Sequence, residues 1–306
     1  MRRFLAGFAR ADTTAVEFTA VSWNLFHGRD FPPDPALFTW RSRLLRTEER
    51  NATHVQVNRE LVAEFAALLA GAEWDVALLQ ECPPRFAAPL AETCDAEAHR
   101  VLTSRNSLRP LRTSIARRNP DLIASGEGGS NLTLVRNSLR CALCTSNEQK
   151  AHRSGGVAER RELAIHAGRP ERRAMAFTRV NLGEGAGLCV ANLHATNDRP
   201  DLATADVLRA AEAATEWAGD SPLLFGGDLN LRPAEDPDVF EELRERFGLA
   251  GPTHPRAIDH LLARDLEITG SPRTWPPEQR ELRQDGLRLR LSDHAPVQAR
   301  FKTGSP

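Results

Sequence analysis

Several residue types are absent or scarce in this chain of 306 residues. It contains no tyrosine, which excludes any mechanism that needs a phenol. Lys150 and Lys302 are its only lysines, and neither lies in a motif for phosphate binding or a Schiff base, so both lysine chemistries are excluded. No segment approaches the roughly 18 apolar residues of a membrane-spanning helix, and the apolar run at residues 4–9 is too short for a signal sequence. We therefore expect a cytoplasmic protein.

Cysteine and net charge are scarce as well. The five cysteines are too few and odd in number for a disulfide framework, which favours a reducing compartment. Cys141 and Cys144 form a C-x-x-C, but no second cysteine or histidine pair follows at zinc spacing, so we interpret the motif as incidental. The 40 basic and 41 acidic residues leave a net charge of -1, which identifies no partner.

The charge is unevenly distributed along the chain. Residues 102–180 hold 15 basic and 6 acidic side chains, whereas residues 1–101 and 181–306 are both acidic. An arginine-rich middle section predicts a surface that binds a polyanion, either nucleic acid or a phosphoinositide headgroup. The alternative is that these arginines spread over several faces and form no patch.

Short apolar runs between turn signals predict more strands than helices. There is no linker and no internal repeat, so we expect one monomeric domain over residues 1–306, with a core at about 17–302. The predicted class is α+β, with stacked sheets flanked by helices. Predicted strands cover residues 17–25, 75–80, 131–136, 139–145, 173–181, 188–193, 222–225, 258–263 and 295–301, and predicted helices cover residues 58–69, 202–217 and 238–247.

Polar side chains suited to metal binding or proton transfer follow the buried runs. A single Asn or Asp after a strand is usually a turn former, and each position taken alone carries little weight. Their repetition at strand ends predicts one shared site, because a rigid scaffold presents side chains there into a common cleft. The residues are Asn24, Glu81, His194, Asp228, Asn230, Asp259, His260, Asp293 and His294.

The ordered set of these segments resembles the endonuclease/exonuclease/phosphatase superfamily, whose fold is that of pancreatic deoxyribonuclease. The matching segments span residues 22–297 and read SWNL, LLQE, SNLTLVR, NLHA, GGDLN, IDHLL and SDHAPV. The resemblance implies a four-layered α/β sandwich of two packed mixed sheets flanked by helices. It also implies a divalent-metal-dependent phosphoesterase, with a nuclease as the first expectation. A phospholipid or inositol-phosphate phosphoesterase is the alternative, and a catalytically silent binding protein is a third hypothesis.

Phosphoester hydrolysis needs a cation, a base and hydrogen-bond donors for the charge that develops on phosphate. Glu81 is the best candidate ligand, and the resemblance adds Asn24 and Asp293. Oxygen ligands suit Mg²⁺, or Mn²⁺, better than zinc. We therefore expect a Mg²⁺ site formed by these three residues.

The resemblance also assigns catalytic roles. Asp259 would orient His294, and either His294 or Asp228 would take the proton from water. Asp228 and Asn230 would face the attacking water. His194 would donate to a phosphate oxygen, at a position where abasic-site endonucleases have tyrosine, so abasic-site repair is disfavoured.

Other residues carry weaker signals. Asn131 and Arg173 are candidate substrate-binding residues, although a turn role and a solvated arginine explain them as well. His27 is a single loop histidine near Asn24, and His260 is expected to be structural because it points away from Asp259. Residues 29–51 separate the first strand from its helix. They predict a substrate-facing loop or, alternatively, a small satellite core.

Overall fold

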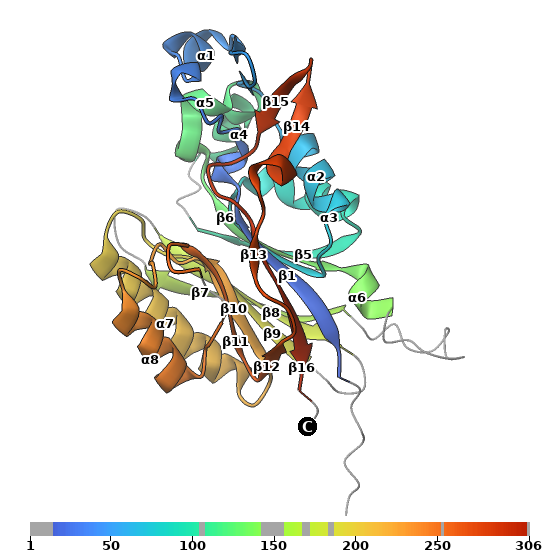
Figure 1. The fold of residues 1–306 in the computed structure, drawn as a ribbon, viewed down its shortest axis with the longest axis vertical. Helices are drawn as coiled ribbons and strands as arrows, with labels where there is room; N and C mark the ends of the chain where they lie inside the picture. The colour runs from blue at the N-terminus through green and yellow to red at the C-terminus, as the bar shows by residue number, and fades with distance from the viewer. Residues whose placement is uncertain are drawn as a thin grey trace, which may run out of the picture.

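The computed structural model describes residues 15–103, 108–141, 156–166, 172–182, 187–251 and 254–304. Two mixed β-sheets pack face to face in this part of the chain (Figure 1). The larger sheet has the order β12, β16, β1, β4, β6, β5, with β13 also paired to β16. Its strands are β1 (Glu17–Asn24), β4 (Val76–Cys82), β5 (Ala96–Leu102), β6 (Ser130–Arg136), β12 (Leu266–Ile268), β13 (Arg273–Thr274) and β16 (Val297–Thr303).

The smaller sheet has the order β11, β10, β9, β8, β7. β9 and β10 run parallel, as do β1 and β4 in the larger sheet, and the other pairs described in both sheets are antiparallel. Its strands are β7 (Gly156–His166), β8 (Arg173–Asn181), β9 (Gly187–His194), β10 (Leu223–Asp228) and β11 (Asp259–Arg264).

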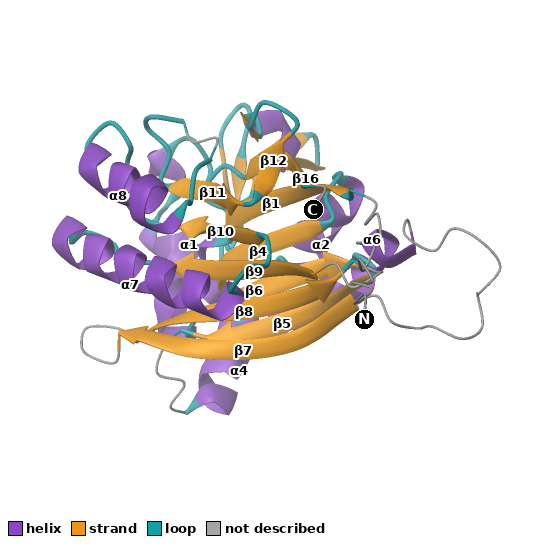
Figure 2. Cartoon of the chain, turned by 90° about the horizontal axis from the view of Figure 1, so that it is seen from below, coloured by secondary structure: helices purple, strands orange, loops and turns teal. Residues whose placement is uncertain are grey.

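Helices cover the outer faces of both sheets and complete four layers (Figure 2). α7 (Pro200–Ala218) and α8 (Pro237–Phe247) pack on the smaller sheet, and α2 (Val62–Gly71) and α3 (Ala87–Thr93) pack on the larger one. The predicted four-layered α+β sandwich is confirmed. Among the described residues, no helix is both long and apolar enough to cross a lipid bilayer.

The alternation of side chains along β4 explains why both faces of the larger sheet are buried. Leu78 packs between the sheets, and its neighbour Leu79 packs toward α2 and α3 on the opposite face. A strand covered on both sides reads as a continuous apolar run, which is how residues 75–80 appear in the sequence. Gln80 follows Leu78 on the inner face, where its Nε2 donates to Asn192 Oδ1 of the smaller sheet (2.8 Å).

Short elements form one end of the molecule, at the top of Figure 1. The elements here are α1 (Trp40–Leu45), α4 (Arg109–Arg118), α5 (Pro120–Ile123), β2 (Glu49–Arg50), β3 (Val55–Gln56), β14 (Glu281–Gln284), β15 (Leu287–Arg290), and the 3₁₀ turns η1 (Phe26–Gly28), η2 (Pro35–Leu37), η4 (Ala124–Glu127) and η5 (Pro277–Arg280). The turn η3 (Pro84–Phe86) precedes α3.

Some local predictions were wrong. The strand expected at residues 139–145 begins instead as the helix α6 (Asn137–Cys141), and the rest of that range, with Cys144 of the C-x-x-C, lies outside the described residues. Residues 29–51 are not a plain loop, because they contain η2, α1 and β2, with Leu37 and Ser42 buried. The helix expected from residue 58 begins at Val62.

Candidate active site

The predicted site residues lie at one edge of the sandwich. Asn24 and Glu81 come from the ends of the parallel strands β1 and β4. In the smaller sheet, Asp228 is in register with His194 on one side and Asp259 on the other. Asn24 Nδ2 donates to Asp228 Oδ2 across the two sheets (2.9 Å), so the site joins both sheets.

Two glycines let β10 approach its neighbours closely before Asp228. A Cβ at Gly227 would overlap the Leu193 carbonyl, and Gly227 also has a φ of +129°, which disfavours other residues. A Cβ at Gly226 would overlap the His260 carbonyl. The GGD sequence is therefore required to place Asp228 between β9 and β11.

Asp228 is a buried carboxyl that accepts hydrogen bonds on both oxygens. The Asn230 backbone N–H donates to Oδ1 (3.1 Å), and Asn24 donates to Oδ2. Burial, together with the charge of Asp259, raises the pKa of Asp228 above its usual range. This carboxyl accepts a proton more readily at neutral pH than an exposed aspartate does.

Arg173 fixes the protonation of His194. Arg173 Nη1 lies 3.3 Å from His194 Nδ1, and because a guanidinium can only donate, Nδ1 must accept. Burial and this arginine lower the pKa of His194 to about 3, so the ring is neutral and carries its proton on Nε2. That nitrogen lies 3.5 Å from Asp228 Oδ2 and 3.7 Å from Glu81 Oε1, which makes it a donor inside the site.

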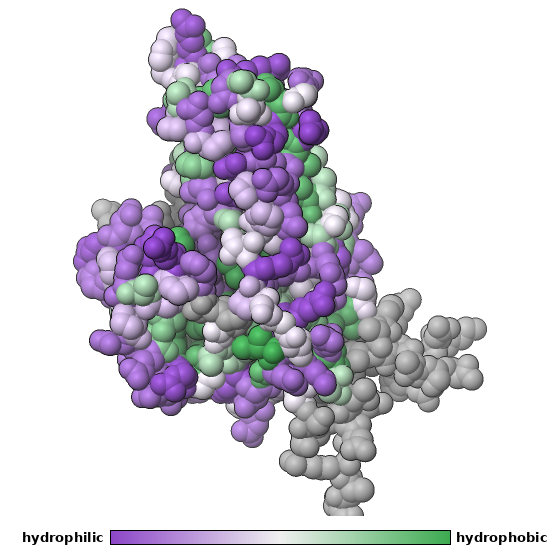
Figure 3. All heavy atoms as spheres, in the orientation of Figure 1, coloured by the Kyte–Doolittle hydropathy of each residue, from purple (hydrophilic) through white to green (hydrophobic). Residues whose placement is uncertain are grey.

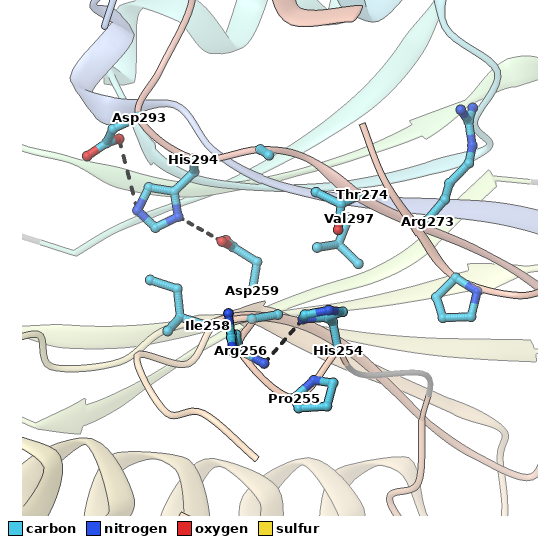
Figure 4. Close-up of a pocket in the computed structure, with 13 residues that line it drawn as sticks. His254, Pro255, Arg256, Ile258, Asp259, Arg273, Thr274, Asp293, His294 and Val297 are labelled. Atoms are coloured by element: carbon cyan, nitrogen blue, oxygen red, sulfur yellow. Dashed lines mark hydrogen bonds and ion pairs between the residues drawn. The ribbon is translucent and has the colours of Figure 1, made fainter. Parts of the chain in front are cut away.

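His294 is held between two aspartates (Figure 4). Its Nδ1 pairs with Asp259 Oδ2 at 2.7 Å, and its Nε2 lies 4.0 Å from Asp293 Oδ1 and 3.9 Å from Asp228 Oδ2. Burial alone would lower the pKa of His294, but the surrounding carboxylates outweigh burial and raise it to about 10. In this arrangement His294 is an imidazolium whose Nε2–H points into the site.

Glu81 sits in a strained backbone conformation. Its φ is +46°, and the register between β4 and β6 shifts at this point. The carboxylate lies 3.0 Å from His27 Nε2. Burial opposes ionisation, but the imidazoles of His27 and His294 hold the pKa of Glu81 below its usual range. The acid is thus ionised and partly exposed to the pocket.

His27 is the residue that sequence reasoning underrated. The available signal was its position three residues after Asn24, in the segment NLFH, where the turn η1 gives it a φ of +54°. Arg29 was not singled out, yet it lines the same pocket, and its guanidinium lies 3.9 Å above the ring of Phe26.

The acids at the site fit a divalent cation. Burial raises the pKa of Asp293, and the charge of Glu81 raises it further, so two acids of like charge face one pocket. A cation between them would relieve this repulsion, and Mg²⁺ needs only one or two protein carboxylates. Asn24 Oδ1 already accepts from the Phe26 backbone N–H (2.9 Å), which leaves one further lone pair for a ligand.

The remaining predicted residues lie close to the site but differ in exposure. Asn131 is fully buried between the sheets, where its Nδ2 donates to the Ala174 carbonyl (2.9 Å), and it does not line the pocket. Asn230 lines the pocket and donates to the Ala195 carbonyl (3.2 Å). His260 is buried and its Nε2 bonds to the Leu231 carbonyl (2.9 Å), away from the pocket.

Two cavities meet at His294. One, of about 270 Å³, holds Asn24, Glu81, Asp228, Asp293 and the histidines between them, and we call it the site pocket. The other, of about 820 Å³, opens on the other side of His294, and Figure 4 shows Ile258, Val297, Arg256 and Arg273 around it. A reacting group in the site pocket can therefore extend into a larger, partly apolar recess.

Comparison of the sequence with models of known protein families shows which family the chain belongs to. Residues 21–294 match the model of the Endonuclease/Exonuclease/phosphatase family. The chain belongs to that family. Family members hydrolyse phosphoester bonds and generally use divalent metal ions. No curated protein matches the chain.

Several solved structures share the fold of this chain at low sequence identity. A family protein from Bacteroides thetaiotaomicron is 12% identical with a TM-score of 0.60, over 95% of this chain and 100% of that one. A mannosyl-6-phosphatase from the same organism is 12% identical (TM-score 0.56; 92% and 98% covered). A truncated Caenorhabditis elegans TDP2 is 15% identical (TM-score 0.52; 93% and 97% covered). These likenesses concern the fold alone.

Proposed function

We propose that this family member is a Mg²⁺-dependent phosphoesterase that hydrolyses a phosphodiester by in-line attack of water, with Mn²⁺ able to replace Mg²⁺. One observation carries the proposal: three acids and three histidines converge on one pocket where the two sheets meet. Glu81 and Asp293, with Asn24 beside them, would hold the cation. When bound, the cation would neutralise the non-bridging phosphate oxygens and lower the pKa of water.

Asp228 is our candidate for the general base. It is buried, its raised pKa favours proton uptake, and both of its oxygens are fixed by Asn24 and the Asn230 backbone. His294 is less suited to this role, because its pairing with Asp259 keeps it protonated. Asp228 would take the proton from the attacking water and release it to solvent after product leaves.

His194 and His294 would stabilise the charge that grows on phosphate. Both present an Nε2–H toward Asp228, the first as a neutral ring and the second as a cation. Donors fixed before the reaction stabilise a developing oxyanion without reorganising. Arg173 and Asp259 act through these rings, by fixing their tautomer and orientation.

Two classes of substrate, nucleic acid and phospholipid, are candidates for this site. The sequence-based preference for nucleic acid stays a prediction, because parts of the arginine-rich range, residues 104–107, 142–155 and 167–171, lie outside the described residues. A second candidate is a phospholipid. Exposed leucines on α4 and α5 favour it, because they could contact lipid. They also lie near the site pocket, since Ala124 and Ser125, which line that pocket, directly follow α5.

A substrate panel tests the proposal. Single- and double-stranded DNA, RNA, phosphoinositides, sphingomyelin and a chromogenic phosphodiester would be incubated with Mg²⁺, Mn²⁺ or EDTA. We expect hydrolysis of at least one substrate with either metal and none with EDTA. Glu81→Ala serves as the blank, and Glu73→Gln, an exposed glutamate that pairs with Arg300, serves as the matched control. Equal hydrolysis by wild type and Glu81→Ala would refute the site.

A further inference from the structure

The exposed apolar side chains of this protein are concentrated at one end. Nine large apolar side chains are exposed among the described residues, and eight of them lie within residues 31–45 and 108–122; the ninth is Ile268. We call residues 30–51 and 108–123 the cap. Single exposed apolar residues are normal on a protein surface, but their gathering in one region marks an interaction site. The eight are Phe31, Phe38, Trp40, Leu44, Leu45, Leu108, Leu111 and Leu122.

Hydrogen bonds tie the two parts of the cap together. Asn119, between α4 and α5, donates from Nδ2 to the Arg43 carbonyl of α1 (2.9 Å). Asn58 Nδ2 donates to the Ser42 carbonyl (2.9 Å) and to Asn119 Oδ1 (2.6 Å). The apolar side chains of the two segments therefore belong to one connected structure.

Helix geometry places Trp40 and Leu44 of α1 on the side that faces away from the protein. Ser42 is buried and bonds to Gln56, so it marks the inward face. Trp40 and Leu44 lie two positions before and after Ser42, about 200° away around the helix, and are 63% and 57% exposed. They share the outward face as an i, i+4 pair. Figure 3 shows hydrophobic and hydrophilic side chains interspersed over this end of the molecule.

Arginines surround these apolar groups. The helices α1 and α4 contain arginines and no acidic residue. Three acids of the cap are bonded locally: Glu48 pairs with Arg50 (2.6 Å), Glu49 accepts from Thr39 and Thr47, and Asp34 accepts from the Ala36 backbone N–H and from Asn51. A cavity of about 690 Å³ beside α4 is lined by Arg85, Pro110, Thr113, Ser114, Arg117 and Arg118. Arg85 is paired with Glu60 and Glu127, so the guanidinium groups that would meet a phosphate in this cavity are those of Arg117 and Arg118.

We propose that the cap is a docking surface for a bilayer that contains anionic phospholipid. A tryptophan and leucines flanked by arginines match the bilayer interface, where apolar side chains enter the acyl boundary and cations meet the headgroups. Nucleic acid fits less well, because leucine side chains neither stack on bases as aromatic rings do nor hydrogen bond to them. The docking surface does not depend on the proposed phosphoesterase function.

Co-sedimentation of the full chain with vesicles tests the proposal. One set of vesicles is phosphatidylcholine alone, and the other contains phosphatidylserine as well. We expect binding to the mixed vesicles to exceed binding to phosphatidylcholine by at least about tenfold at low salt, and to weaken as salt is added. Equal binding to the two sets, or no binding to either, would overturn the proposal.

Two double variants separate the two contributions. Arg117→Gln with Arg118→Gln is expected to weaken binding to mixed vesicles by about thirtyfold, because each arginine near an anionic surface contributes about fivefold. Trp40→Ala with Leu44→Ala is expected to weaken it by about tenfold or more. The matched controls, Arg244→Gln with Arg246→Gln on α8 and Ile268→Ala on β12, should bind as wild type does. Unchanged thermal unfolding verifies that each variant is folded.

Two other outcomes would contradict the bilayer assignment. If the Arg117→Gln, Arg118→Gln variant loses binding to oligonucleotides while wild type ignores both kinds of vesicle, the cap binds nucleic acid. If wild type sediments as a dimer without vesicles and Trp40→Ala with Leu44→Ala restores the monomer, a second copy of the chain covers the cap.

Discussion

The site pocket and the cap adjoin each other, yet they place polar and apolar side chains in opposite ways. In the site pocket, charged groups are largely buried and bond to one another, as in the His294–Asp259 pair. In the cap, Trp40 and several leucines are exposed beside arginines. Burial of ionisable groups shifts their pKa values, as proton transfer in an active site requires. Exposed apolar and cationic side chains instead suit the binding of a partner surface. We therefore expect that the proposed catalysis and the proposed docking can be altered separately in this molecule.

The largest expected effect on rate is at His294. We expect His294→Ala to lower kcat on a chromogenic phosphodiester by about 10³-fold, since an electrostatic or proton-donating group of this kind contributes about 10²- to 10⁴-fold. Steady-state kinetics at saturating Mg²⁺ measures it, and vesicle binding by the same variant should be unchanged. A variant that retains more than about a tenth of the rate would place His294 outside the reaction.

A smaller loss is expected at Asp259, which we propose acts through His294 rather than on substrate. Asp259→Asn keeps the shape but removes the charge that holds the imidazolium, so we expect kcat to fall about 10- to 100-fold. KM should change by less than about twofold, because binding groups are untouched. A rise in KM with constant kcat would show that Asp259 supports substrate binding instead.

Thermodynamic stability tests the close packing of β10 beside the site pocket. Gly227→Ala should unfold the site edge, because the new Cβ meets the Leu193 carbonyl and φ is positive; we expect a loss of at least about 3 kcal/mol in the free energy of unfolding. Gly71→Ala at the end of α2 has open space and is the matched control. Urea denaturation compares them, and equal midpoints would mean that β10 does not need its close contact.

The smallest effect is expected in the cap. Trp40→Ala with Leu44→Ala should change the rate on a chromogenic phosphodiester by less than about twofold, because both side chains are exposed on the outward face of α1. The same assay as for His294 measures it. A large loss of rate on this small substrate would break the distinction between docking and catalysis.

The site residues at the strand ends could be predicted from the sequence, because a buried strand appears there as an apolar run followed by polar residues. Leu78, Leu79 and Glu81 illustrate this, because Glu81 lies two residues after the apolar run that ends at Leu79 and just before the end of β4. The pairing of Asp259 with His294 could not be worked out from spacing alone, since 35 positions separate them, and only the family resemblance suggested it. One domain over residues 1–306 stays a prediction, supported by the core that both sheets share.

Edge strands and short helices escaped prediction for physical reasons. β5 and β7 are the last strands of their sheets and carry charged residues along their length, so neither shows an apolar run. α4 has Arg at four of its ten positions and little apolar periodicity. The cap was therefore visible only as the arginine content of residues 102–180 and the aromatic residues of 29–51.

Direct metal binding tests the central claim, that the residues at the strand ends form a divalent-cation site for phosphoester hydrolysis. Binding of Mn²⁺, followed by electron paramagnetic resonance, would be compared in wild type, Glu81→Gln and Glu73→Gln, with hydrolysis measured on the same samples. We predict that wild type and Glu73→Gln bind Mn²⁺ and hydrolyse substrate, and that Glu81→Gln loses both, the rate falling on the order of a thousandfold. Hydrolysis by Glu81→Gln at the wild-type rate, or by wild type in EDTA, would contradict the account.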